Sequence, residues 1–175
     1  KRDGSHLIII ALSLTLPRSA EPVVHYYDIA RYIEEHELKN LSIADMRAMT
    51  LEVRKGKFPD LSQVGTAGSF FKNPILSENE LEQLRVRFPD IPSYETDNSG
   101  KKIALAWILD KVCDVKGYRK DDVGLFDKQP LVLVNYGNAT AKEIKLFADE
   151  IVSLVKEKTG ILVEFEARFI GNFFG

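Results

Sequence analysis

The chain has one cysteine, Cys113, among 175 residues, so it cannot form an internal disulfide. A chain without disulfides suits a reducing compartment, and we expect it to be cytoplasmic. Cys113 falls in an apolar helical stretch, where a buried and inert thiol is expected. The three histidines, His6, His25 and His36, share no metal-ligand spacing. The sequence therefore predicts no zinc site and no other metal site.

A charge imbalance and a long apolar run are also lacking. The 24 Lys and Arg residues against 26 Asp and Glu residues leave a formal net charge of −2. Such a balance gives no general attraction to nucleic acid or to an anionic membrane, so we expect neither as a partner. The apolar run Leu7–Leu16 is too short to span a bilayer, and it lacks a signal-peptide cleavage pattern. We expect a β-strand there.

The composition, 45% hydrophobic and 29% charged, is that of a globular domain with a sizeable core. No internal repeat or low-complexity segment is found. The patterns predict an α+β fold, with a small mixed sheet packed against several helices. The expected helices cover 28–37, 42–55, 77–88, 104–113 and 140–159. The expected strands cover 7–16, 131–134 and 161–166, and the polar segment 89–102 is expected to be a loop.

Three of these helices have recognisable start signals. In a capping box, a Ser or Thr hydroxyl accepts a backbone N–H three residues on, and the acidic residue there accepts the N–H of the capping residue. A glycine is the usual stop, and Gly160 follows the last helix. The residue pairs that predict capping boxes are Ser42 with Asp45 (in place of the usual Glu or Gln), Ser77 with Glu80, and Thr140 with Glu143.

The most informative stretch is Gly65-Thr66-Ala67-Gly68-Ser69-Phe70-Phe71-Lys72-Asn73-Pro74. Its two glycines permit a positive φ and a close approach to a ligand, and they lead directly to the hydroxyl of Ser69. Asn73 precedes a proline and is therefore kept out of the α region, which restricts where its amide points. Taken alone, the stretch fits an ordinary glycine turn entering a buried strand equally well, with Phe70 and Phe71 in the core.

The decapeptide resembles the Gly-Asn-Ala-Gly-Ser-Phe-Phe-Lys-Asn-Pro signature of the UDP-N-acetylenolpyruvoylglucosamine reductases, with Thr66 in place of Asn. Further segments similar to that family lie before and after the decapeptide, in the same order as in the family, and cover nearly the whole chain. In the last of them, Phe165 and Ala167 stand where the family has Pro and Val. The segments are Pro22–Tyr26, Arg54–Asp60, Ala106–Asp110 with Lys116–Tyr118, Lys128–Asn135 and Glu164–Gly171.

The resemblance implies a reductase of peptidoglycan synthesis that uses NADPH and FAD to convert UDP-N-acetylglucosamine enolpyruvate to UDP-N-acetylmuramate. It implies that Ser69 donates a proton to the substrate and that Glu166 is also catalytic. Tyr94 resembles a mobile-loop tyrosine that closes over the substrate in one branch of the family. Taken singly, each binding residue is better explained as an ordinary surface residue. The implied substrate-binding residues are Tyr26, Lys57, Asn73, Tyr94 and Gln129.

The resemblance covers the substrate-binding part of the family. The family binds FAD through an N-terminal region with a glycine-rich pyrophosphate segment and a Tyr-Arg-x-Ser motif, and this sequence contains neither. We therefore expect residues 1–20 to be a residual strand of the FAD-binding region and 21–175 to be the substrate-binding domain. We expect no tightly bound cofactor and no activity from this chain without the missing FAD-binding domain.

Two other interpretations stay open. The chain could be a stand-alone, non-catalytic module that binds a UDP-sugar. It could also be a structural α+β domain in which the signature residues serve only the packing of the core. The presence of both Ser69 and Glu166 argues against the binding module, since sugar-nucleotide binding requires neither. An FAD-binding segment in the parent gene would distinguish the reductase from both alternatives.

Overall fold

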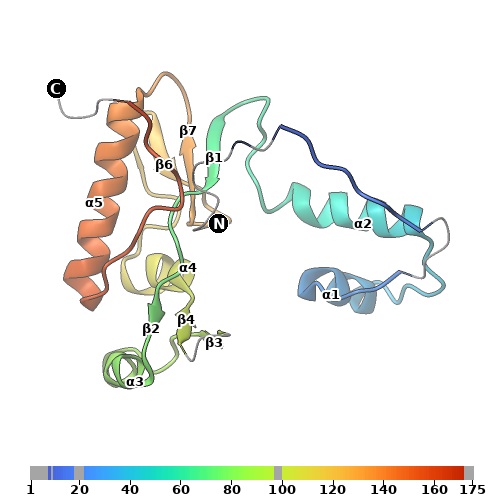
Figure 1. Cartoon of the computed structure of the whole chain (residues 1–175), viewed down its shortest axis with the longest axis horizontal. Coiled ribbons are helices and arrows are strands. Elements are labelled where there is room, and N and C mark those ends of the chain that lie inside the picture. The colour runs from blue at the N-terminus through green and yellow to red at the C-terminus, as the bar shows by residue number, and fades with distance from the viewer. Residues whose placement is uncertain (1–7, 9, 18–21, 97–99, 172–175) are drawn as a thin grey trace. The chain divides into compact units, whose positions relative to one another are not determined.

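The computed structural model describes residues 8, 10–17, 22–96 and 100–171. The chain divides into two compact units, Lys1–Val53 and Arg54–Gly175, whose elements are labelled in Figure 1. Helices and antiparallel sheets together make an α+β fold, so the expected fold class is confirmed. The expected division between residues 20 and 21 stays a prediction.

The first unit contains α1 (Tyr27–Glu35) and most of α2 (Ile43–Lys55), which confirms both helices expected in this region. The capping box before α2 forms with an aspartate. The Ser42 N–H donates to Asp45 Oδ2 at 2.8 Å, and the Asp45 N–H donates to Ser42 Oγ at 3.2 Å. An aspartate therefore reaches far enough to close this box.

The strand expected over residues 7–16 is not formed in the part of it that the structure describes, residues 8 and 10–16. Leu7 and Ile9 lie outside the described residues. The alternate apolar side chains are exposed, at 71–94% for Ile8, Ile10, Leu12, Leu14 and Leu16. Alternation predicts one apolar face, but a strand also needs a neighbouring strand for its backbone N–H and C=O groups. No such pairing is formed among the described residues of this segment, so this prediction is wrong there.

The second unit is built on a four-stranded antiparallel sheet in the order β1-β7-β6-β5. Its strands are β1 (Gly65–Ser69), β5 (Arg119–Lys120), β6 (Val123–Leu125) and β7 (Val132–Asn135). The strand expected at 131–134 is thereby confirmed as β7. Figure 1 shows α5 (Ala141–Thr159) alongside β6, which it contacts.

The longest helix begins and ends where its sequence signals predict. The Thr140 N–H donates to Glu143 Oε2 at 2.7 Å, and the Glu143 N–H donates to Thr140 Oγ1 at 3.3 Å. Gly160 ends α5 in the left-handed conformation, with φ of 80°. One face of α5 is buried in the core through Phe147, Ala148, Ile151 and Val155.

A second, three-stranded antiparallel sheet has the order β2-β4-β3. It consists of β2 (Ile75–Leu76), β3 (Ser93–Glu95) and β4 (Lys101–Ile103). The expectation of a loop over 89–102 is therefore wrong at 93–95 and 101–102, and it is confirmed at 89–92, 96 and 100. Glu95 and Lys101 are direct cross-strand partners and form an ion pair at 2.5 Å. Opposite charges facing each other stabilise a strand whose polar composition indicated a loop.

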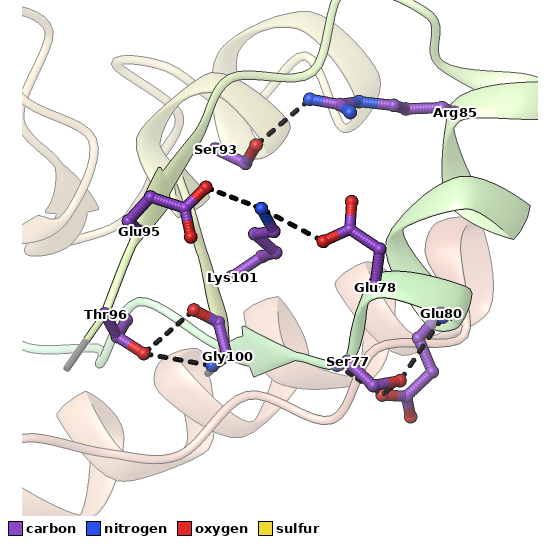
Figure 2. A network of polar contacts seen from close by, with 9 residues as sticks. All are labelled: Ser77, Glu78, Glu80, Arg85, Ser93, Glu95, Thr96, Gly100 and Lys101. Carbon is purple, nitrogen blue, oxygen red and sulfur yellow. Dashed lines mark hydrogen bonds and ion pairs between the residues drawn. The ribbon is translucent and has the colours of Figure 1, made fainter. Parts of the chain in front are cut away.

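The helix α3 (Glu78–Arg87) leads from β2 towards β3 and carries the expected capping box. Figure 2 shows this box beside Lys101, which also pairs with Glu78 at 3.0 Å. Hydrogen bonds from Lys101 to Glu95 and Glu78 raise its pKa. Leu81 and Leu84 are buried and Phe88 is half-buried, as the helical spacing predicts.

The helix expected over 104–113 is formed by a short α4 (Leu105–Trp107) that continues as a π-helical turn, Ile108–Val112. Cys113 follows it and is buried, and this burial raises the pKa of its thiol, as expected for an inert cysteine. The segment expected as a strand over 161–166 makes only one isolated bridge, between Phe71 and Phe165. That prediction is therefore wrong except at this single pair.

Candidate functional site

Ser69 is the last residue of β1 and lies opposite Val132 of β7. The register shifts between Thr66 and Ser69, where Gly68 adopts φ of 79°. Gly68, and not Gly65, therefore supplies the left-handed backbone conformation that the signature allows. The Ser69 side chain is exposed, and its hydroxyl forms no hydrogen bond with the described part of the chain.

Thr66 supports this irregularity in the strand. Its hydroxyl donates to the Leu133 carbonyl at 2.7 Å and accepts the Gly68 N–H at 3.0 Å. From the sequence, Thr66 was only a departure from the family signature, and this role was not predicted. A hydroxyl residue two positions before a glycine is the signal that could have found it, because such residues bond the backbone two positions on.

Glu166 is attached to the residue next to Ser69, although the two are far apart in the sequence. The Glu166 N–H donates to the Phe70 carbonyl and the Lys72 N–H donates to the Glu164 carbonyl, both at 2.9 Å. These bonds flank the antiparallel Phe71–Phe165 bridge. Since the Phe70 N–H donates to Leu131 on the opposite side, the segment around Glu166 extends the sheet beyond β1. Both Ser69 and Glu166 are exposed at this edge.

Gln129 lies at the same end of the sheet. Its carbonyl accepts the N–H of Val132, the residue opposite Ser69, at 2.9 Å. It stands in the turn before β7, which begins at Val132. Its side chain is half-buried, and Oε1 accepts the Leu131 N–H at 3.5 Å.

Asn73 connects the signature to the following helix. Its Oδ1 accepts the N–H of Leu105, the first residue of α4, at 3.0 Å. Because a backbone N–H can only donate, this bond identifies the amide atom that faces α4 as Oδ1. The amide nitrogen, Nδ2, which can only donate, is left for another partner. No hydrogen bond of Nδ2 to the described residues is formed.

Lys57 and Tyr94 are placed by other elements of the second unit. Lys57 is half-buried in the turn that follows α2, where its N–H donates to the Arg54 carbonyl at 2.9 Å. Tyr94 is 60% exposed in β3, opposite Lys102. Its neighbours in the strand are anchored, since Ser93 accepts a bond from Arg85 at 3.0 Å and Glu95 pairs with Lys101, as Figure 2 shows. The expectation that Tyr94 lies in a loop is therefore corrected.

Tyr26 belongs to the first unit and is described there by itself. It is the N-cap residue of α1, and its carbonyl accepts the N–H groups of Ile29 and Ala30 at 3.0 and 3.1 Å. Its side chain is 53% exposed.

A cavity of about 220 Å³ lies between the β5–β6 hairpin and the start of α5, and none of the seven expected site residues lines it. In the parts of the chain that the structure describes, no three His, Cys, Asp or Glu residues are grouped so that they could hold a metal ion. No helix in those parts is both long and apolar enough to cross a bilayer.

The second unit thus belongs to a class of α+β domain in which the backbone of a glutamate, Glu166, bonds to the residue that follows a Gly-Ser strand irregularity. The family described as "UDP-N-acetylenolpyruvoylglucosamine reductase, C-terminal domain" matches residues 60–170. The chain belongs to this family, which confirms the resemblance found in the sequence.

Relatives named UDP-N-acetylenolpyruvoylglucosamine reductase support the same assignment. The one from Photobacterium profundum is 37% identical over 166 residues, which cover 94% of this chain and 46% of that protein. Those from Chromobacterium violaceum and Xylella fastidiosa are each 36% identical and cover 92% and 98% of this chain. The chain spans about half the length of the curated relatives it matches.

Proposed function

We propose that this chain is the substrate-binding part of a reductase that converts UDP-N-acetylglucosamine enolpyruvate to UDP-N-acetylmuramate with NADPH and FAD. The relatives carry the name of this reductase, and the family match covers residues 60–170. The observation that carries the proposal is the backbone pairing that attaches Glu166 to the residue after Ser69. A cytoplasmic location belongs to the proposal and is supported by the buried free thiol of Cys113.

The flavin is assigned to the other half of the enzyme. A dinucleotide diphosphate is usually held by uncapped N–H groups at a helix N-terminus. In this chain the N-termini of α2, α3 and α5 are already closed by Asp45, Glu80 and Glu143, whose carboxylates repel a diphosphate. These three helix starts therefore do not fit an FAD diphosphate, and the roles proposed for this chain concern the substrate alone.

Ser69 is proposed to donate the proton. Reduction of the enolpyruvyl double bond adds hydride to one carbon and leaves a strongly basic centre on the next. Even a weak acid such as a serine hydroxyl can protonate that centre if it is held close to it. This role is supported by the exposure of the Ser69 side chain at the end of a strand that Gly68 and Thr66 shape.

Glu166 is proposed to act in the same enolpyruvyl site, where it polarises the substrate or assists proton transfer. Its backbone bond to Phe70 keeps it at the sheet edge that ends in Ser69. An exposed glutamate is ordinarily only a solvated surface group, so its role depends on this placement.

The diphosphate of the substrate needs a cation and hydrogen-bond donors. Lys57 is proposed to supply the charge, while Asn73 Nδ2 and Gln129 Nε2 supply donors. The bond from Leu105 to Asn73 Oδ1 favours this assignment, because it turns the donor nitrogen of the amide away from α4. Tyr26 and Tyr94 complete the proposed set as exposed phenol donors.

The proposal is tested by Ser69→Ala in the complete protein. Turnover is expected to fall by roughly 10²–10⁴, the usual effect of losing a positioned general acid. Substrate affinity, measured by calorimetry, is expected to change little because one neutral hydrogen bond contributes only about 1 kcal/mol.

Ser153→Ala, which removes an exposed hydroxyl from α5, is the matched control and should retain full turnover. Wild-type turnover in both Ser69→Ala and Glu166→Gln would exclude the proposed catalytic roles of these two residues. A complete wild-type protein that binds the substrate without turning it over would favour the non-catalytic binding module.

A further inference from the structure

Residues 161–171, here called the C-terminal strap, carry Glu166 but contain no helix or strand. The backbone of the strap is attached to residues 70–72 by two hydrogen bonds, which together form the Phe71–Phe165 bridge. So short a ladder opens readily in water unless side chains hold it closed. The position of Glu166 therefore depends on what else fastens the strap.

Aromatic rings provide such a fastening. The ring centroid of Phe165 lies 5.9 Å from that of Phe70 and 5.2 Å from that of Phe169, both edge to face. It lies 6.0 Å from the ring of Phe71 in a tilted arrangement. Phe70 and Phe71 are buried in the core, at 4% and 2% exposure, so these contacts connect the strap to the rigid part of the domain. Edge-to-face pairs at these separations are favourable beyond simple burial.

A cation from a third element faces two of these rings. Lys145 projects from α5 with Nζ 5.3 Å from the ring centroid of Phe169 and 5.8 Å from that of Phe165. Its side chain is 19% exposed and pairs with Asp149 one turn further along the helix. A partly desolvated ammonium over aromatic faces strengthens their association. The strap is thus held between the sheet edge and α5.

We propose that Phe70, Phe71, Phe165 and Phe169, together with Lys145, form an aromatic clamp that positions Glu166, with Phe165 as its central positioning residue. The two ladder bonds use the amides of Lys72 and Glu166 and not that of Phe165, so Phe165 acts through its ring. Glu166 follows it directly in the chain, and a fixed ring at 165 restricts the backbone of the next residue. The importance of this clamp for catalysis rests on the proposed role of Glu166.

The clamp is tested first on the chain itself by amide hydrogen exchange. Phe165→Ala is expected to speed exchange of the Glu166 and Lys72 amides by about tenfold, while the Val134 amide in β7 keeps its rate. Phe165→Tyr retains the ring and should restore slow exchange. Phe88→Ala removes another half-buried phenylalanine, one stacked on Arg87, and should leave both strap amides unchanged. Unchanged exchange in Phe165→Ala, or equal acceleration at all amides, would overturn the clamp.

Kinetics of the complete protein then test positioning. Phe165→Ala should lower kcat about tenfold or more with KM little changed, and Phe165→Tyr should restore kcat. If Glu166→Gln is impaired and Phe165→Ala turns over like wild type, the clamp does not position Glu166. If Glu166→Gln itself has no effect, the proposed role of Glu166 fails, while the exchange result still decides whether the clamp exists.

Discussion

The hydroxyl of Thr66 uses both its donor and its acceptor capacity on the backbone, and two residues later the chain turns through Gly68. Together they bring β1 to an end with an exposed serine. This is a residue-scale device: a bonded hydroxyl and a left-handed glycine replace regular strand geometry over a few positions. Its contribution to stability can be measured by replacing glycines with alanine.

Alanine substitutions at three glycines should reduce the free energy of unfolding by different amounts, in an order that the structure predicts. At Gly68 an added Cβ meets no atom within 4 Å, so Gly68→Ala should cost only the conformational strain, about 1–2 kcal/mol. At Gly124 the Cβ would lie 2.8 Å from the Tyr118 carbonyl and 3.1 Å from Arg119 Cα, and backbone atoms cannot easily move. Gly124→Ala should therefore destabilise more. Gly56→Ala, with open space and no positive φ, should change stability little.

Urea unfolding of the three variants gives the ranking. A Gly68→Ala chain that is less stable than Gly124→Ala would contradict the account of both sites.

At the scale of elements, helix starts are governed by local carboxylates. The backbone and hydroxyl of Thr140 donate to Glu143, and these bonds lower the pKa of Glu143. The same arrangement with Ser77 lowers the pKa of Glu80. Both boxes form between residues three positions apart, so they need no tertiary contact.

The capping carboxylate of α5 predicts an acid-sensitive contribution to stability. Because the folded pKa of Glu143 is below its ordinary value of 4.5, its ionised form stabilises the fold above pH 4.5. This contribution is lost as the pH falls below 4.5 and through the lowered folded pKa. The free energy of unfolding of Glu143→Gln should therefore change less with pH than that of wild type over this window. Urea unfolding from pH 6 to pH 3 measures this difference.

Glu157→Gln, at an exposed position near the end of the same helix, is the control. It should retain the wild-type pH dependence, and a Glu143→Gln chain with an unaltered dependence would exclude the capping carboxylate as its source.

At the scale of the whole molecule, the described core belongs to the second unit, where both sheets, α3, α4 and α5 contribute to one hydrophobic cluster. The second unit also contains six of the seven expected site residues, and the family match lies entirely within it. Under the proposed function, this unit is therefore expected to bind a UDP-sugar by itself, with lower affinity than the complete protein.

Binding by the chain alone should depend on Lys57. Lys57→Ala is expected to weaken binding of UDP-N-acetylglucosamine enolpyruvate by about 1.5–3 kcal/mol, the effect of losing a charge-assisted hydrogen bond. Isothermal calorimetry measures the difference. Lys142→Ala, which removes an exposed lysine at the start of α5, should bind like wild type. Equal affinity in Lys57→Ala and Lys142→Ala would remove Lys57 from the site.

Features that depend on neighbours along the chain follow from the amino-acid sequence alone. The three capping boxes, the stop at Gly160 and the buried faces of α3 and α5 were all predictable, because helical bonds and caps join residues three or four positions apart. The family could also be predicted, since the signature and its companion segments are linear patterns.

Features that require a partner far away in the sequence depend on the tertiary fold. The pairing of Glu95 with Lys101 makes strands of a polar segment, whereas the apolar alternation of residues 10–16 makes no strand without a partner edge. The bond of Glu166 to Phe70, the neighbour of Ser69, likewise joins segments far apart in the sequence. Backbone groups of a strand bond only to another segment, and the local sequence does not encode which segment that is.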